Sequence, residues 1–366
     1  MPRIRIAQSP ARDPAVAVAE VRAALEGACA GGVLVFADDG LPTGALADAL
    51  AAAFPGPLAG CTAAGVVGED GFARRGLLAM AFDGAHARLH PLPLGPLDDA
   101  AACAARVAAA MPAPTPGWHR AGVLLIDGLS TREEAVAAAL ARALPGLEII
   151  GGSAGDDLAF AGTAVLVDGR FQAGTGVLVL LESDAPLAVL RSHHFETGIR
   201  KLVCTRAEPE RRLLLELDGA PAAGVYARSL GLAEADLGPA VFSRNPLEVR
   251  EGARSRVVSI ARVMPEGALA LLGAIEEGES MSIARALDPR ERLLATLAAV
   301  RCAIGEPEAV LGLDCILRRV QFEDEGIAGE MGELYARHRI AGFSTYGEQC
   351  HGAHMNQTLV GVAFGR

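Results

Sequence analysis

Three glycine-rich turns carry the small polar side chains with which this chain could bind a ligand. The turns span residues 60–65, 151–155 and 342–347, and each follows a short apolar run. Glycine lets backbone N–H groups converge on an anion such as a carboxylate, and ligands of α/β sheets gather where strands end. Tight packing of a repeated turn is the alternative. If the turns line a small-molecule pocket, we expect its ligand-binding residues to be Thr62, Ser153, Asp156, Arg318, Ser344, Tyr346 and Glu348.

Arg318 has two interpretations that the sequence leaves open. It follows Asp314 and Cys315 on the apolar run 309–317, which we take as a strand. Its guanidinium could hold a ligand carboxylate through two parallel hydrogen bonds. It could equally pair with Asp314 or Glu348 and stabilise the end of the sheet. Cys315 is expected to be a small buried hydrophobe.

Two groups of residues could bind haem or another metal. His193 and His194 follow the strand-like segment 186–192, so their side chains should point to opposite faces and one could enter an interior pocket. A neutral imidazole is a good ligand of haem iron. The second group is a C-H-x-x-H pattern whose thiol and imidazoles suit zinc, copper or iron but lack the fourth ligand of a structural zinc site: Cys350, His351 and His354. Solvated or hydrogen-bonded structural histidines are the alternative in both groups.

Catalytic chemistry has one weak sequence signal. Residues 151–155, GGSAG, match the G-x-S-x-G nucleophile elbow, which requires a helix directly after the serine. The residues that follow indicate a turn and a strand instead. We therefore expect no enzyme and no catalytic residues, with a hydrolase acting through Ser153 or Cys61 as the remaining alternative.

The elements that position these residues recur as a repeated unit of strand, helix, short strand and glycine-rich turn. Helices are indicated where apolar residues recur at spacings of three and four, and Ser130 or Thr131 is expected to cap the second one. A helix between two strands predicts βαβ-like units, and hence an α/β fold of two packed domains with mixed sheets. The predicted strands and helices of the three copies are 32–37 with 44–54, 122–126 with 131–144, and 309–317 with 324–337.

Composition excludes several classes of protein. The chain has 366 residues with a formal net charge of −11, which argues against binding to nucleic acid, whose phosphates demand a basic surface. The sequence shows no apolar run of about 18 residues and no signal-peptide pattern. Its seven cysteines are dispersed and odd in number, which fits reduced thiols in the cytoplasm better than a disulfide framework.

Six motifs, taken in order, resemble those of the FIST family of bacterial and archaeal sensory proteins. They are DGRFQAGTGVLVLL (168–181), RSHHFETG (191–198), ELDGAPAAGVYARSLG (216–231), LDCILRR (313–319), GFSTYGE (342–348) and MNQTLVGVAF (355–364). The resemblance implies a lead-in at 1–29, a FIST N-terminal domain at 30–220 and a FIST C-terminal domain at 221–366. The chain departs from the family pattern at His194 and at Gln349–His351.

The resemblance implies a stand-alone cytoplasmic sensor of a small ligand. Some relatives bind haem and report nitric oxide to a histidine kinase or a cyclic-di-GMP enzyme, so the sharpest hypothesis is a haem-based nitric oxide sensor with such a separate partner. A sensor of an amino acid or other small metabolite, bound at the glycine-rich turns, is the alternative. Whether the protein forms a homodimer stays open.

Overall fold

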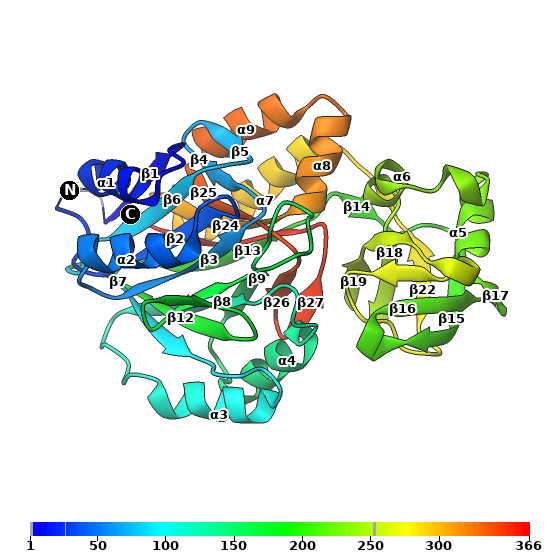
Figure 1. Cartoon of the computed structure of the whole chain (residues 1–366), viewed down its shortest axis with the longest axis horizontal. Coiled ribbons are helices and arrows are strands. Elements are labelled where there is room, and N and C mark those ends of the chain that lie inside the picture. The colour runs from blue at the N-terminus through cyan, green and yellow to red at the C-terminus, as the bar shows by residue number, and fades with distance from the viewer. Residues whose placement is uncertain (1–2, 26, 252–253) are drawn as a thin grey trace.

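The molecule consists of a large core and a smaller insert that lies beside it (Figure 1). The computed structural model describes residues 3–25, 27–251 and 254–366. Three repeats of about equal size build the core. The insert, drawn in yellow-green, interrupts the third repeat between residues 193 and 286.

The first two repeats have the same order of elements: strand, helix, strand, helix, strand, hairpin, strand. The first contains β1 (Ile4–Ser9), α1 (Pro14–Ala24), β2 (Gly32–Asp38), α2 (Thr43–Ala53), β3 (Leu58–Ala63), β4 (Val66–Gly68), β5 (Gly71–Ala73) and β6 (Leu77–Phe82). The second contains β7 (Ala87–Pro93), α3 (Ala100–Ala110), β8 (His119–Ile126), α4 (Glu133–Ala143), β9 (Ile149–Ser153), β10 (Val165–Val167), β11 (Arg170–Gln172) and β12 (Gly176–Ser183).

The third repeat follows this order except that the insert stands between its first strand and its first helix, and that two helices, α8 and α9, stand where the other repeats have one. It contains β13 (Leu187–Ser192), α7 (Pro289–Ile304), β24 (Ala309–Cys315), α8 (Ile316–Asp324), α9 (Ala328–Arg337), β25 (Ile340–Thr345), β26 (Glu348–Cys350), β27 (Ala353–Met355) and β28 (Leu359–Phe364). The predicted three-fold repetition is therefore confirmed, and so is the mixed α/β class.

Each repeat forms its own six-stranded mixed sheet, but each sheet borrows its last two strands from another repeat. The strand orders are β1-β6-β2-β3-β10-β11, β7-β12-β8-β9-β26-β27 and β13-β28-β24-β25-β4-β5. The central pairs β2–β3, β8–β9 and β24–β25 are parallel, because a crossover helix joins their strands. The hairpin of every repeat thus crosses to a neighbouring sheet, in a cyclic exchange that ties the three repeats together.

The central strands are apolar along their whole length because both faces of each sheet are covered. One face of all three sheets meets in a common core, where Phe36 of β2 stacks on Phe343 of β25 with ring centroids 4.6 Å apart. The outer faces are covered by helices: α1 and α2 on the first sheet, α3 and α4 on the second, α7 and α9 on the third.

The insert has its own sheet and its own apolar core. Its sheet runs β19-β18-β22-β15-β16-β21-β20, and one face of it packs on two helices through Tyr226 and Phe242. Its elements are β14 (Phe195–Glu196), β15 (Lys201–Glu208), β16 (Leu213–Leu217), β17 (Ala220–Pro221), α5 (Ala222–Leu230), α6 (Pro239–Arg244), β18 (Leu247–Glu251), β19 (Arg254–Val258), β20 (Ile260–Val263), β21 (Leu269–Leu271), β22 (Ser280–Ile283) and β23 (Arg285–Ala286). The sheet pair β14–β23 joins the two chain segments that enter and leave the insert.

The strand prediction for Arg318 was wrong. The predicted strand 309–317 ends at Cys315, and Arg318 lies on α8, which begins at Ile316. The helical turn lets the Arg318 Nε donate to Asp314 Oδ1 at 2.6 Å, a contact between residues four apart. The predicted single helix 324–337 is α9, separated from α8 by Gly326 in the left-handed region at φ 71°.

The capping prediction was also wrong, because α4 begins at Glu133 with Arg132 at its N-cap and no side-chain cap. Ser130 instead closes the preceding turn: its hydroxyl donates to the carbonyl oxygen of Asp127 at 2.7 Å. The segment 1–29, taken as a lead-in, holds β1 and α1 of the first repeat, while its residues 1, 2 and 26 lie outside the described residues. No helix in the described ranges is long and apolar enough to span a bilayer.

Candidate functional site

The three glycine-rich turns meet at one end of the core, as the repeated strand ends predicted. Their N–H groups are used to bind one another: Ser344 N donates to Gly65 O at 2.8 Å, Gly155 N to Thr62 O at 3.1 Å, and Ser153 N to Gly347 O at 2.9 Å. These donors are therefore not free to hold an anion. The geometry favours the packing interpretation of the turns over the ligand pocket.

Most polar side chains of the turns are likewise bonded inside the protein, although the buried Ser344 hydroxyl has no hydrogen-bond partner among the described residues. Ser153 is fully buried, and its hydroxyl accepts from Gln349 Nε2 at 3.0 Å. Tyr346 donates its hydroxyl hydrogen to Asp156, whose carboxylate also accepts from the backbone N–H groups of residues 160, 161 and 162. A carboxylate ringed by N–H groups fixes the loop after β9.

The remaining predicted residues are just as enclosed. Glu348 accepts from the Thr345 hydroxyl and, at 3.1 Å, from Thr358 N; burial raises the pKa of its carboxyl well above the usual range. Thr62 accepts from Ala164 N at 3.0 Å, and Ser344 is 1% exposed. The structure thus brings the predicted set to one end of the core, but as a closed packing centre.

Of the two interpretations of Arg318, its environment favours the internal ion pair with Asp314. It is 1% exposed and is bonded to Asp314, to His194 Nδ1 at 2.8 Å and to Tyr335 Oη at 3.3 Å. Each of its three nitrogens has a protein partner and the side chain is enclosed, which favours the internal ion pair over a ligand carboxylate. Cys315 is fully buried, as expected.

His193 and His194 differ in exposure, although they lie between β13 and β14 and not within a strand. His194 is fully buried, and both ring nitrogens are bonded, Nδ1 to Arg318 and Nε2 to Gln321 Oε1 at 2.8 Å. His193 is half-buried, and its Nδ1 has no hydrogen-bond partner within the described ranges. Burial lowers the pKa of His193, and Arg191 and Arg318 lower it further.

The C-H-x-x-H residues do not converge. Cys350 packs in the core and contacts His351 Nδ1 through its thiol at 3.0 Å. Across the β26–β27 hairpin, His354 bonds Gln349 Nε2 at 3.0 Å and the Leu272 carbonyl at 3.1 Å. No cluster of three His, Cys, Asp or Glu side chains suited to a metal ion exists in the part of the chain that the structure describes.

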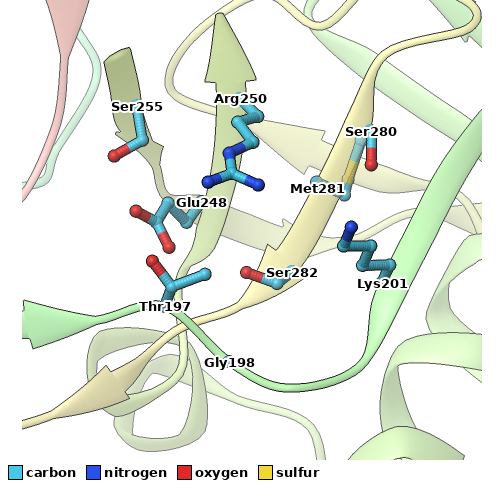
Figure 2. Close-up of a pocket in the computed structure, with 9 residues that line it drawn as sticks. All are labelled: Thr197, Gly198, Lys201, Glu248, Arg250, Ser255, Ser280, Met281 and Ser282. Carbon is cyan, nitrogen blue, oxygen red and sulfur yellow. The ribbon is translucent and has the colours of Figure 1, made fainter. Parts of the chain in front are cut away.

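A different site, the insert pocket, is hollowed on the exposed face of the insert sheet (Figure 2). Strand alternation creates it, because Lys201, Glu248 and Arg250 point to this face while their neighbours Leu202 and Val249 enter the apolar core. The cavity volume is about 90 Å³. Its lining residues are Thr197, Gly198, Lys201, Glu248, Arg250, Ser255, Ser280, Met281 and Ser282.

Strand register places the charged groups in order. Glu248 of β18 and Lys201 of β15 both pair with Ser282 of β22, so the three residues form one row across three strands. Arg250 lies two residues beyond Glu248 on the same face and pairs with Ser255 of β19. In Figure 2 the ends of Lys201, Arg250 and Glu248 surround the Ser282 hydroxyl.

These groups are not consumed by internal bonds. Glu248 Oε2 is buried without a hydrogen-bond partner, and neither Lys201 nor Arg250 forms an ion pair with any residue in the described ranges. An unpaired buried carboxylate oxygen is costly unless a donor reaches it. The pocket therefore presents two cations and one anion that a bound molecule could neutralise.

The pocket lies where the chain passes between the core and the insert. Thr197 and Gly198 belong to the outgoing segment, only a few residues after His194. Ser282 precedes the returning segment. A Cβ at Gly198 would overlap the carbonyl oxygen of Ile283, so this wall of the pocket requires a glycine.

Sequence reasoning missed the pocket, although two signals pointed to it. Lys201 is the sole lysine among the 33 lysine and arginine residues of the chain. The segments around Lys201, Glu248 and Ser282 alternate polar and apolar residues, which is typical of half-buried strands with one functional face. Their juxtaposition depends on pairing between residues far apart in the chain, such as Lys201 with Ser282.

The residues present do not fit a haem. His194 and His354 use both ring nitrogens in hydrogen bonds, and His351 Nδ1 contacts a thiol. His193 offers an unpaired Nδ1. The insert pocket lies near His193, because the charge of its Glu248 raises the pKa of that histidine. With a volume of about 90 Å³, however, this pocket is far too small for a porphyrin.

Two family models match the chain. The FIST N domain matches residues 32–220 and the FIST C domain matches residues 222–351. No curated protein matches the chain at a significant level. The boundary between the two matched domains falls inside the insert, between β17 and α5. The family domains therefore divide the chain at a different point from the core and the insert of the structure.

Proposed function

The chain belongs to the FIST family of small-ligand sensory domains in signalling, and on this premise we propose that it senses a small charged metabolite bound in the insert pocket. The observation that carries the proposal is the unpaired, buried Oε2 of Glu248, which shares the insert pocket with two cations, Lys201 and Arg250, that have no ion-pair partners in the described ranges. FIST domains are non-catalytic, and the closed environment of Ser153 supports no hydrolase.

The size of the pocket limits the ligand. A water-sized group needs roughly 10–15 Å³ of such space. The volume of about 90 Å³ therefore suits a compact molecule with on the order of ten non-hydrogen atoms. An amino acid or a small organic acid has this size. We therefore propose the insert pocket as the metabolite site, in place of the glycine-rich turns that the sequence suggested.

Reporting requires that the two ligation states differ in their affinity for a partner. The insert pocket is built on the segments that join the insert to the core, so occupancy can bias how the two bodies sit together. We propose that a separate protein, such as a histidine kinase or a cyclic-di-GMP enzyme, detects that change.

The test is a thermal-shift screen of amino acids and organic acids, followed by calorimetry on the hits. Ligands that bind only the native state raise the melting temperature. Ser282→Leu, which fills the floor of the pocket, should abolish the shift. Arg262→Leu, at an exposed position of β20 in the same insert, should keep it. A hit that survives Ser282→Leu would place the ligand elsewhere.

The haem hypothesis is tested on the same protein by absorption. We expect haemin to give no sharp Soret band at stoichiometric ratio, because the histidine environment does not fit it. A sharp band that is lost in His193→Ala would reverse this view and select the nitric oxide sensor.

A further inference from the structure

The charges of the insert pocket define the class of its ligand more narrowly than the proposed function, on which this inference rests. We infer that the ligand carries two anionic groups and one cationic group, for a net charge of −1. Lys201 and Arg250 give the pocket two positive charges and Glu248 gives one negative charge. Lys201 and Arg250 are exposed, whereas Glu248 Oε2 is buried, so a ligand of the complementary composition satisfies the buried oxygen and leaves neither cation unpaired when it covers them.

Strand register assigns each ligand group a position. Glu248 and Lys201 stand on either side of Ser282, two strand spacings apart, which is about 10 Å between their backbones. They form no direct ion pair, so a molecule between them can meet the carboxylate with its ammonium and the lysine with a carboxylate. Arg250, two residues from Glu248 along β18, can receive the second carboxylate, which a guanidinium binds through two parallel hydrogen bonds.

Neutral donors complete the site. Ser255, Ser280, Ser282 and Thr197 line the cavity, and their hydroxyls form no side-chain hydrogen bond with the described residues. A hydroxyl can donate to a carboxylate or accept from an ammonium. Met281 lies between Ser280 and Ser282 on β22 and belongs to the apolar core of the insert.

Three probes of nearly equal size separate the charge contributions in calorimetric titrations. L-Glutamate has two carboxylates and an ammonium, glutarate lacks the ammonium, and L-glutamine lacks the second carboxylate. We expect glutamate to bind at least about tenfold tighter than either, since one charge-assisted hydrogen bond is worth that much. Glu248→Gln should erase the preference for glutamate over glutarate. Lys201→Met or Arg250→Met should erase the preference for glutamate over glutamine. Arg262→Gln is the matched control and should keep both preferences.

The sole lysine supplies an independent readout. Reductive ¹³C-methylation keeps its charge and labels one side-chain amine, which Lys201→Arg identifies by loss of its NMR signal. That signal should shift with glutamate and stay in place with glutamine. Tighter binding of glutamine, of glutarate or of a diamine would overturn the charge assignment while leaving a metabolite sensor in place. Absence of binding by all three probes would overturn the assignment as well, and the broad screen then judges the proposed function separately.

Discussion

His194 shows at the scale of a single residue how a predicted metal ligand becomes a structural group. A guanidinium can only donate, so Nδ1 of His194 must accept from Arg318, and Nε2 must carry the proton that it donates to Gln321. Burial lowers the pKa of His194, and the charge of Arg318 lowers it further, to about 3. The ring is therefore a neutral Nε2–H tautomer that joins the linker to α8.

The first prediction follows from this tautomer. Nitrogen NMR should find His194 neutral and protonated on Nε2 at pH 5. Because the unfolded chain takes up this proton near 6.5 and the folded protein only near 3, the free energy of unfolding should fall as pH drops through that window. His194→Asn should remove this part of the pH dependence. An imidazole that titrates above pH 5 in the folded protein would contradict the assignment.

At the scale of elements, the charged centre of the second sheet is Glu182 on β12. It lies between β7 and β8 and accepts from Arg88 Nε at 2.9 Å, His90 Nε2 at 2.9 Å and Arg120 Nε at 2.8 Å. Burial raises the pKa of Glu182, but the hydrogen bonds from these three side chains outweigh it and lower the pKa to about 2. This carboxylate links three adjacent strands.

Glu182→Gln should therefore destabilise the protein in a pH-dependent way. The pKa of the folded state lies below the ordinary value of 4.5, so the stabilisation is complete above that pH and is lost as pH falls toward 2. We expect the free energy of unfolding, measured by denaturant unfolding, to be lower than in the wild type by roughly 2 kcal/mol at neutral pH. This difference should decrease on acidification. Glu216→Gln, which breaks an exposed cross-strand pair with Arg206, should cost under about 1 kcal/mol. A gap that is independent of pH would refute the charge-based account.

Elements were predictable from sequence where the signal is local. The apolar run 32–37 and the helix 44–54 agree with β2 and α2 to within one residue, and the run 122–126 forms the second part of β8, because periodicity and proline punctuation act within one segment. The hairpin exchange was not predictable, since β4 pairs with β25 of another repeat. The insert pocket was missed for the same reason: its charged row exists only through the register of β18, β22 and β15.

At the scale of the whole molecule, two charged contacts join the insert to crossover helices of the core, in addition to buried hydrogen bonds such as that from Ser259 N to Asn356 Oδ1 at 3.0 Å. On one side Arg212 donates to Glu133 at 2.6 Å and to Glu134 at 2.9 Å, near the N-terminus of α4. On the other, Arg244 of α6 forms ion pairs with Asp324 and Glu325 at the end of α8. The Arg212 contacts are buried, whereas the Arg244 contacts are exposed, so the α4 side should dominate.

The last prediction concerns this clamp. Arg212→Met leaves Glu133 buried without its cation, which typically costs about 3–5 kcal/mol for a buried pair and should free the insert on its α4 side. Spin labels on the exposed Cys302 of α7 and on Arg228→Cys of α5 report the distance between the two bodies. We expect a broader distance distribution in Arg212→Met than in the wild type, and little change in Arg244→Met. Ligand should narrow the distance distribution of the wild type and leave that of Arg212→Met broad. Binding of the ligand, measured by calorimetry, should persist in Arg212→Met because Arg212 lies outside the insert pocket. Equal distributions in both variants and in both ligation states would show that the insert is rigidly fixed, and the signal would then have to leave through the pocket face itself.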